Sequence, residues 1–577
     1  MHATATNQTH AIPLNAGDSA APRASVPAPA VSALICFLLS LAMHLPWIGV
    51  TPLAGTEAHR VFPARAMVQS HWWLVPTLFG NPFMTKPPLH HWLIAASEII
   101  AGRGNVFVWR LPSALAGAAL CAVACWFAAR WFGKTPGLIS GMCAAGMIAV
   151  WGQSQVADID ATNTFFAAVT ALCGIESLIV QHDAKPGRRA VWTLAAGLAL
   201  SGTLLTKGPG ALPIILGVWG WSAAFAIRHH HASRILSPPF WAPLLIGGIS
   251  AGVYAWAAHR SLHAHGLPFD PAGVREGASR LYPHGVGELA KSFYLFLPSL
   301  FAYAFPMSLA MPLAFDADVR AQFQDESRRI IFALIAAVLI AWAIYVATGN
   351  SNPRYAYPTL ILFCPLAGAV ATAAVKTRRT ADWLRGIAVV SAIALMLATV
   401  GLGAKCWNGH SLRAMIVVSA IIAIVVAFWT VRRLSYSWRG AWGLVALFVL
   451  TSVPFGMQRH IARTKDSTKY TTSVKLRDVI GDNALVACFA AAYDKPETFY
   501  YAHARVFLPL RKADFIPADV PAGTWVILAA NRKFDTDEYR TWHAVPGVRL
   551  DREMFLCRNE PTDYYLAWYG GISRAKR

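Results

Sequence analysis

Acidic and basic side chains that could carry chemistry gather in short segments between long apolar runs. The first segment reads Gly55-Thr56-Glu57-Ala58-His59-Arg60, and Lys86 follows it in Thr85-Lys86-Pro87-Pro88. Charged residues beside a bilayer are costly to keep, so an acid together with several cations there indicates a functional site. In a purely structural alternative, Glu57 pairs with His59 or Arg60 in a solvated cluster at the rim of the loop.

Further polar segments stand at the ends of later apolar runs. In chain order they are Asp158 and Asp160, Lys207, Arg275 and His284, and Arg354 with Tyr355 and Tyr357. Lys and Arg neutralise phosphate oxygens, and a carboxylate can orient or deprotonate a hydroxyl. Together these residue types predict a substrate with an anionic phosphate and a reacting hydroxyl. Alternatively, Lys86 and Lys207 are interfacial anchors at helix ends, and Asp160 is the N-cap of the helix that follows it.

The composition indicates a membrane protein. Of the 577 residues, 56% are hydrophobic and only 14% are charged, and the mean hydropathy is +0.43. Soluble proteins carry about 25% charged residues. The net charge of +21 does not indicate nucleic-acid binding, because the basic residues lie in short loops between apolar runs. We therefore predict membrane lipids as partners and no nucleic-acid partner.

About thirteen apolar stretches are long enough to cross about 30 Å of hydrocarbon as helices. They fall at residues 31–50, 111–130, 137–151, 163–181, 191–205, 210–227, 240–258, 293–314, 330–348, 357–375, 386–404, 413–431 and 440–456. If the N-terminus is cytoplasmic, the short loops rich in Lys and Arg all stay on the cytoplasmic side, as the positive-inside rule requires. All the candidate polar segments then lie on the opposite side.

The chain is expected to have three parts. They are a disordered cytoplasmic tail at 1–30, a transmembrane catalytic domain at 31–457 with outer loops 51–107 and 259–292, and an α/β domain on the outer side at 458–577. The last part is large enough for a core of its own. Its cysteines, Cys488 and Cys557, could form a disulfide in an oxidising compartment.

The sequence makes no firm prediction of a cofactor. It contains no Gly-rich loop that would hold the phosphates of a nucleotide. A divalent metal stays open as an alternative. His90-His91 could bind it with Glu57 and His59, but adjacent histidines point to different faces of a helix, which makes this set a poor candidate.

A series of motifs runs through the apolar region in a characteristic order. They are Thr56–Met67, Trp73–Pro76, Gly80–Trp92, Arg110–Ser113, Asp160 with Thr164–Phe166, Leu205–Pro209, Phe305–Ser308 and Arg354–Pro358. This order resembles the GT-C-fold glycosyltransferases that use polyprenyl-phosphate sugars, and in particular the lipid A aminoarabinose transferase-like group related to protein O-mannosyltransferases. Two positions depart from the family pattern. Thr56 replaces the first Asp of an Asp-Glu pair, and Thr85 replaces a Glu before Lys-Pro-Pro.

The resemblance implies a bacterial inner-membrane enzyme that works on the periplasmic side. It would transfer a sugar from a polyprenyl-phosphate donor to lipid A, another glycan or a protein, by inverting displacement. By this resemblance Lys86 and Lys207, with Arg275, stabilise the departing lipid phosphate, and Glu57 or Asp160 orients or deprotonates the acceptor. The residues expected to line the substrate site are His59, Arg60, Asp158, His284, Arg354, Tyr355 and Tyr357.

Two other classes of function stay open. A transporter or flippase of a lipid-linked or anionic substrate would also have about a dozen spans. Carriers, however, place charged residues near the bilayer midplane within repeated halves, whereas this chain has no repeated halves and keeps its charges at one face. The Thr at position 56 leaves a catalytically inactive, lipid-binding relative as the third class.

Overall fold

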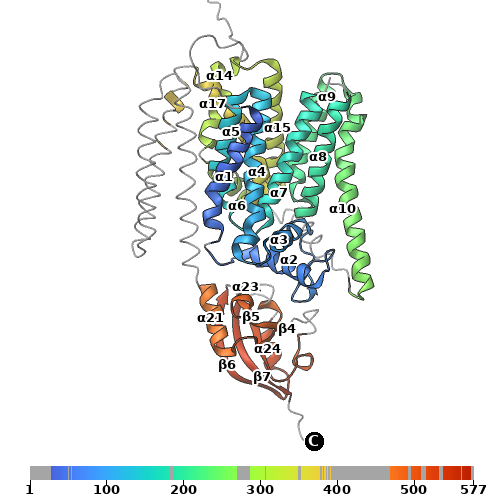
Figure 1. Cartoon of the computed structure of the whole chain (residues 1–577), viewed down its shortest axis with the longest axis vertical. Helices are drawn as coiled ribbons and strands as arrows, with labels where there is room; N and C mark the ends of the chain where they lie inside the picture. The colour runs from blue at the N-terminus through green and yellow to red at the C-terminus, as the bar shows by residue number, and fades with distance from the viewer. Residues whose placement is uncertain are drawn as a thin grey trace, which may run out of the picture.

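The protein consists of a helical bundle followed by a small sheet, as a computed structural model shows (Figure 1). The structure describes residues 28–268, 286–380, 382–384, 386, 390 and 468–572, apart from short gaps at 50, 54, 182–185, 306, 349–351, 377–379, 492–495, 508–514, 532–536 and 560–561. The predicted tail, 1–30, lies outside these residues except for 28–30.

Long apolar helices form the bundle. They are α1 (Pro29–Ile48), α4 (Val106–Phe132), α7 (Ile159–Ile175), α8 (Pro186–Lys207), α9 (Leu212–Arg228), α10 (Pro238–Ala264) and α15 (Asp325–Ala347). Within the described residues, six helical segments are long and apolar enough to cross a membrane, or eight if each of two bent pairs is one span. The bent pairs are α5 (Lys134–Gly146) with α6 (Ile148–Ser154), and η7 (Pro353–Ala356) and α16 (Tyr357–Leu360) with α17 (Phe363–Ala374). The chain is therefore a multi-pass membrane protein.

The predicted spans up to residue 375 all fall on helical segments, but not all are continuous. The predicted 191–205 and 210–227 spans are α8 and α9. These helices are joined by η3 (Gly208–Ala211), and together they form one apolar helical segment of 42 residues. The predicted 293–314 span is divided among short pieces. They are η5 (Ser292–Phe296), α13 (Leu297–Tyr303) and η6 (Met307–Phe315), after α12 (Val286–Lys291) and before α14 (Ala317–Ala321). The last three predicted spans lie outside the described residues, apart from 386 and 390, so the total of thirteen stays a prediction.

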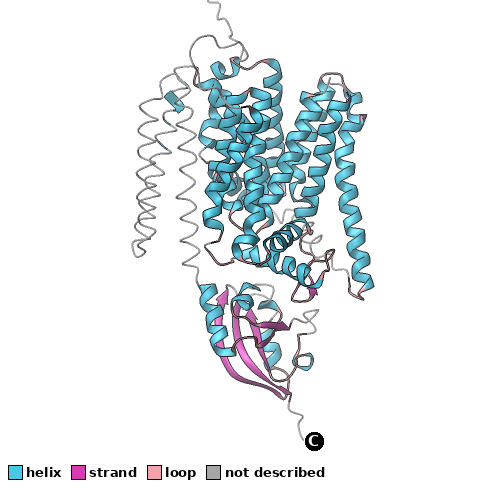
Figure 2. Cartoon of the chain, viewed as in Figure 1, coloured by secondary structure: helices cyan, strands magenta, loops and turns pink. Residues whose placement is uncertain are grey.

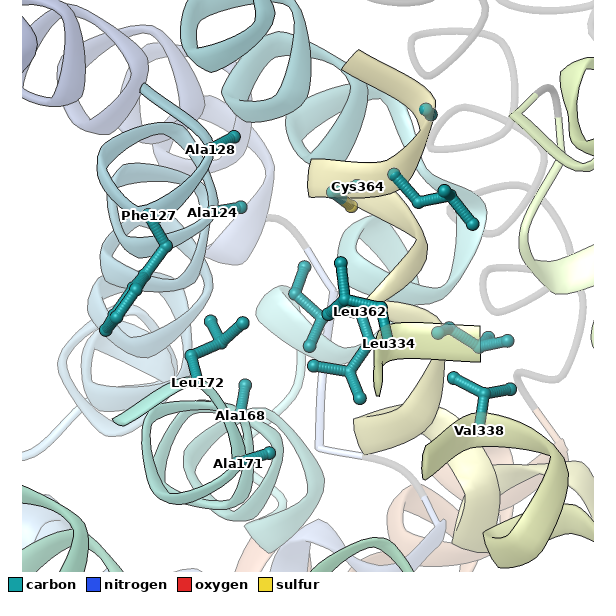
Figure 3. Packing of buried hydrophobic residues seen from close by; sticks show 14 of the residues in the cluster. Ala124, Phe127, Ala128, Ala168, Ala171, Leu172, Leu334, Val338, Leu362 and Cys364 are labelled. Carbon is teal, nitrogen blue, oxygen red and sulfur yellow. The ribbon is translucent and has the colours of Figure 1, made fainter. Parts of the chain in front are cut away.

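Small residues allow the helices to approach closely at the centre of the bundle. Figure 3 shows Ala124 and Ala128 of α4 and Ala168 of α7 in the same buried cluster as the larger side chains of Leu334 and Leu362. Between α17 and α5 the approach is closer still, because a Cβ added to Gly368 would lie 2.3 Å from the carbonyl oxygen of Pro136. Such contacts suit a lipid environment, where packing and not water exclusion holds helices together.

The segment after α1 lies across one end of the bundle. It contains η1 (Gly55–Glu57), α2 (Ala58–Ser70), the short strands β1 (Thr77–Leu78) and β2 (Asn81–Pro82), and α3 (Leu89–Ala101). Figure 1 shows α2 and α3 between the bundle and the C-terminal sheet. A buried apolar cluster that includes Val61 of α2, Ile94 of α3 and Trp109 of α4 fixes this segment to the bundle.

The C-terminal sheet has five strands in the order β4-β3-β5-β7-β6 (Figure 2). Its elements are α21 (Thr468–Ile480), β3 (Leu485–Cys488), α23 (Pro496–Tyr501), β4 (Arg505–Phe507), η9 (Pro517–Asp519), β5 (Thr524–Asn531), α24 (Glu538–His543), β6 (Val548–Asn559) and β7 (Thr562–Ile572). Strand β3 pairs in parallel with β4 and β5, and β7 pairs antiparallel with β5 and β6.

The suggested disulfide in this sheet is wrong. Cys488 on β3 and Cys557 on β6 are not joined by a disulfide. Two strands, β5 and β7, stand between them. Neighbouring strands lie about 4.8 Å apart, so the two Cα atoms are far beyond the reach of a disulfide.

Gly368→Ala should destabilise the bundle. The added Cβ would lie 2.2 Å from Ser140 Oγ and 2.3 Å from the Pro136 carbonyl oxygen, and overpacking of this kind costs about 1–3 kcal/mol. We expect the Tm of the detergent-solubilised protein to fall by several degrees. Gly252→Ala on α10 is the matched control, because nothing lies within 4 Å of a Cβ at that position. Equal shifts in both variants would contradict the packing described.

Candidate functional site

A cavity of about 590 Å³ opens at the end of the bundle that faces the sheet. It lies among η1, α6, the start of α7 and the η7–α16 turn. Its lining residues are Gly55, Thr56, Glu57, Ile148, Trp151, Gly152, Gln153, Val156, Asp158, Asp160, Tyr303, Arg354 and Tyr357. Segments that are about 300 residues apart in the sequence therefore line the same polar wall of the cavity.

Asp160 is the centre of the charged part of this wall. Its Oδ1 accepts a hydrogen bond from Lys207 Nζ at 2.6 Å, and its Oδ2 accepts one from Arg354 Nε at 2.9 Å. Arg354 Nη2 also donates to Asp158 Oδ2 at 2.9 Å, so one guanidinium joins both carboxylates. The Lys207 side chain is only 7% exposed and lies over the Tyr355 ring, 4.6 Å from its centroid. The interpretation of Lys207 as a headgroup anchor is therefore wrong.

Asp158 joins the first outer loop to this cluster. Thr56 Oγ1 donates to its Oδ2, and Arg60 Nε lies 3.4 Å from its Oδ1. Burial by itself raises the pKa of Asp158, but the guanidinium groups of Arg60 and Arg354 outweigh burial and hold the pKa below its usual range. Asp158 is consequently a carboxylate at neutral pH.

The N-cap of α7 is Asp158 and not Asp160, which corrects the sequence-based expectation. The Asp158 carboxylate accepts from the backbone N–H of Ile159 at 2.8 Å. Asp160 lies in the first turn of the helix, where a negative charge also interacts favourably with the helix dipole. Its carboxylate is thus left to bind Lys207 and Arg354.

Glu57 is buried, and its carboxylate binds Arg110. Arg110 Nε donates to Glu57 Oε1 at 2.7 Å and Nη2 donates to Oε2 at 2.9 Å, while the N–H of Ala157 also donates to Oε1. Both side chains are almost fully buried, at 0% and 2% exposure. The alternative in which Glu57 pairs with His59 or Arg60 in a solvated cluster is therefore wrong. A catalytic role for Glu57 stays a prediction.

The other predicted site residues are distributed unevenly. Tyr357 lines the cavity beside Tyr303, with ring centroids 5.1 Å apart. His59 stacks on the Phe83 ring at 5.5 Å. Lys86 is half-buried in the loop before α3 and is not among the described residues that line the cavity. Predicted residues that lie outside the described part of the chain are Arg275 and His284.

The metal set suggested by the sequence is not assembled. His90 Nδ1 lies 3.0 Å from Thr162 Oγ1, and His91 Nε2 lies 3.4 Å from the carbonyl oxygen of His59. Among the described residues, no three side chains of His, Cys, Asp or Glu are grouped as metal ligands. The acids at the cavity bind cationic side chains instead.

Sequence reasoning missed several residues of the site. Arg110 was named only as part of the motif Arg110–Ser113 and not as a site residue. An Arg among apolar residues nevertheless indicates that an acidic partner is buried with it. Trp151 and Gln153 lie in α6, where Trp151 is the last residue of the predicted 137–151 span and Gln153 lies just beyond it. Gln153 Oε1 accepts from Thr164 Oγ1 at 2.9 Å, which fixes the amide at the cavity wall. No periodicity in the sequence identifies these two residues.

Arg110→Ala should be strongly destabilising. Removing one partner of a buried ion pair leaves an uncompensated charge, here Glu57, and costs about 3–5 kcal/mol. We expect the variant to lose most of its folded yield, or to show a Tm lower by ten degrees or more. Arg328→Ala is the control, because that side chain is 47% exposed at the far end of the bundle. A Tm equal to that of the control would show that the Arg110–Glu57 pair contributes little.

Stability should fall on acidification through the buried histidines of α3. Burial lowers the pKa of His90 to about 4 and that of His91 to about 3, whereas an unfolded His titrates near about 6.5. The unfolded state therefore binds more protons between these values, and each histidine removes up to about 1.4 kcal/mol per pH unit below about pH 6.5. We expect a smaller fall in Tm between pH 6.5 and 4 in His90→Gln than in the wild type. The exposed His229→Gln should keep the wild-type slope, and an unaltered slope in His90→Gln would contradict the assignment.

The chain matches known proteins in sequence over part of its length. A family model of the dolichyl-phosphate-mannose-protein mannosyltransferases matches residues 85–256. The undecaprenyl phosphate-alpha-4-amino-4-deoxy-L-arabinose arabinosyl transferase of Enterobacter sp. (strain 638) is 28% identical over 163 residues, which are 28% of this chain and 29% of the relative. The enzyme of the same name from Pectobacterium carotovorum subsp. carotovorum (strain PC1) is 24% identical over 380 residues, which are 64% of this chain and 65% of the relative. The aligned regions thus span less than two thirds of either relative.

The fold matches over a longer stretch than the sequence does. The crystal structure of ArnT from Cupriavidus metallidurans bound to undecaprenyl phosphate superposes with a TM-score of 0.68 at 15% identity, covering 93% of this chain and 98% of ArnT. The apo form of the same protein gives a TM-score of 0.65. These matches confirm the resemblance predicted from the sequence: this multi-pass membrane protein has the GT-C fold of ArnT, and its residues 85–256 are similar to the mannosyltransferase family.

Proposed function

We propose that the protein is a glycosyltransferase that moves a sugar from a polyprenyl-phosphate donor to an acceptor at the membrane surface. The observation that carries this proposal is the charged cluster at the cavity, which lies at one end of a bundle with the ArnT fold. Among the described residues, the acids that form ion pairs with Arg60, Lys207 and Arg354 are Asp158 and Asp160. One positive charge therefore remains in excess, which suits a phosphate monoester.

The donor phosphate would bind where the cations meet the cavity. Arg354 is the most accessible of them, with a third of its side chain exposed, and its Nη1, which takes no part in the bonds to Asp158 and Asp160, can donate to a phosphate oxygen. Lys207 supplies a second, more deeply buried charge. In the proposal, Lys86 and Arg275 approach the same phosphate from the outer loops, as the family resemblance implies.

The reaction proposed is an inverting displacement at the anomeric carbon. The acceptor oxygen forms a bond to this carbon as the bond to the lipid phosphate oxygen breaks. The leaving group departs as a phosphate anion, so fixed cations such as Lys207 and Arg354 contribute more than a proton donor would. Asp160 would orient the acceptor hydroxyl and take its proton. Its oxygens are held by Lys207 and by the partly exposed Arg354, whereas the Glu57–Arg110 pair is almost fully buried, so Glu57 would shape the cavity wall more than transfer protons.

The names of the relatives support a choice of donor. Both curated relatives are named for the transfer of 4-amino-4-deoxy-L-arabinose from undecaprenyl phosphate. We infer a bacterial inner-membrane location with a cytoplasmic N-terminus, which places the cavity and the sheet in the periplasm. The positions of the Lys- and Arg-rich loops support this orientation. Lipid A is the first acceptor to test, followed by other glycans and proteins.

The test is consumption of a radiolabelled undecaprenyl-phosphate 4-amino-4-deoxy-L-arabinose by the purified protein in liposomes that contain lipid A. We expect label to move to lipid A in the wild type. Lys207→Ala and Asp160→Asn should each lower the rate at least about 100-fold, because each removes a preorganised charge from the site. Lys134→Ala, an exposed residue at the start of α5, should keep the wild-type rate.

The outcomes separate the three classes of function. An enzyme converts the donor, whereas a flippase moves the donor between leaflets without cleaving it. An inactive relative binds the donor and does neither. The proposal would be overturned if liposomes that contain the wild-type protein left the donor intact with every acceptor tested.

A further inference from the structure

The C-terminal part of the chain reaches the first outer loop through the helix α23. Its Phe499 ring lies 5.9 Å from Phe79, and its Tyr500 ring lies 5.6 Å from Phe62 and 5.8 Å from Trp109. Aromatic pairs at these distances stabilise beyond the area that they bury. The contact is therefore specific and places α23 directly on the loop.

A half-buried cation, Arg65, reinforces this contact. The guanidinium carbon of Arg65 lies 5.4 Å from the centroid of the Trp109 ring and 5.5 Å from that of the Tyr500 ring, so the cation lies over both rings. Glu98 accepts from Trp109 Nε1 at 2.7 Å and lies 3.7 Å from Arg65. The orientation of α23 is thus determined by several independent contacts.

Next to this contact, one hydrogen bond joins α23 to the backbone of the loop. The hydroxyl oxygen of Tyr501 accepts from the backbone N–H of Leu53 at 2.7 Å, and Leu53 is only 2% exposed. Arg110 holds the carbonyl oxygen of the preceding residue, Pro52, at 2.9 Å. The backbone is therefore held from two sides, by the bundle and by the C-terminal sheet unit.

The residues held in this way lead directly into the cavity. Gly55 follows with a φ of +62°, a conformation that favours glycine, and turns the chain toward the cavity. Thr56 then reaches Asp158, and Glu57 reaches the N–H of Ala157. A shift at Leu53 would move Thr56 and Glu57 relative to the acids of α7.

We propose that Tyr501 is a positioning residue for the reaction: by holding the Leu53 N–H, it sets the place of Thr56 and Glu57 in the cavity. The inference rests on the proposed function for the reaction that is positioned. The geometry assigns the C-terminal unit a part in the site although it contributes no side chain to the cavity lining among the described residues.

The protonation state of Tyr501 is consistent with this role. Burial raises the pKa of Tyr501 to about 12, so the phenol keeps its proton at physiological pH. A neutral hydroxyl can accept from Leu53 without placing a second negative charge near Glu57.

The first test needs no substrate. Tyr501→Phe keeps the ring and removes only the oxygen, and Tyr500→Phe removes the same atom from the neighbouring ring, whose hydroxyl makes no hydrogen bond within the described residues. Hydrogen–deuterium exchange of the full-length protein should show at least a tenfold loss of protection at the Leu53 amide in Tyr501→Phe and none in Tyr500→Phe. Unchanged protection in Tyr501→Phe would overturn the inference, whatever reaction the protein catalyses.

The second test uses the transfer assay with undecaprenyl-phosphate 4-amino-4-deoxy-L-arabinose. Tyr501→Phe should lower kcat at least fivefold with KM for the donor within twofold and a Tm close to the wild type, while Tyr500→Phe keeps the wild-type kcat. Because Tyr501 acts through the loop that holds Thr56, the two substitutions should not be independent. The fold loss of kcat in the double variant Tyr501→Phe/Thr56→Val should be smaller than the product of the fold losses in the two single variants. Fully multiplicative effects, or a kcat that falls only with the folded fraction, would overturn the inference.

The two proposals fail in different ways. Greater exchange at Leu53 in Tyr501→Phe, together with a wild-type protein that never consumes the donor, would refute the proposed reaction and leave the loop contact standing.

Discussion

One buried guanidinium, that of Arg110, determines the course of the chain after the first helix. It donates to the carbonyl oxygens of Ile48, Thr51 and Pro52 and to both oxygens of Glu57. A fully buried charge is tolerated only when it is paired and its donors are satisfied. The loop therefore has to wrap around Arg110, and this path brings Thr56 and Glu57 to the N-terminus of α7.

The cavity is built on the same principle, with the charges less completely buried. Asp158 and Asp160 form ion pairs with Lys207, Arg354 and Arg60, and the Arg354 side chain remains partly exposed. In a site with little water, such charges act more strongly than in solution and need no rearrangement when an anion arrives. In the part of the chain that the structure describes, this cluster has one more cation than acids, which favours a phosphate over a neutral ligand.

Much of the fold could be predicted from the sequence. The lengths of the apolar runs located α1, α4, α7, α10 and α15, because the thickness of a bilayer sets the length of a spanning helix. The loops rich in Lys and Arg put the polar segments on one side, and the structure shows several of them around one cavity. The breaks inside the 293–314 segment and the bend between α5 and α6 were not predicted, because overall hydropathy does not reveal where a helix is interrupted.

The sequence predicted which residues belong to the candidate site better than it predicted which of them bind each other. The sequence by itself determined that Asp158, Asp160, Lys207 and Arg354 would stand at one face of the membrane, since charge and chain order are enough to decide topology. Only the tertiary structure decided that Asp160 binds Lys207, 47 residues away, and that Glu57 binds Arg110, 53 residues away. Side chains within a few ångströms of each other interact whatever their separation in the chain, and that distance is set by how the helices pack.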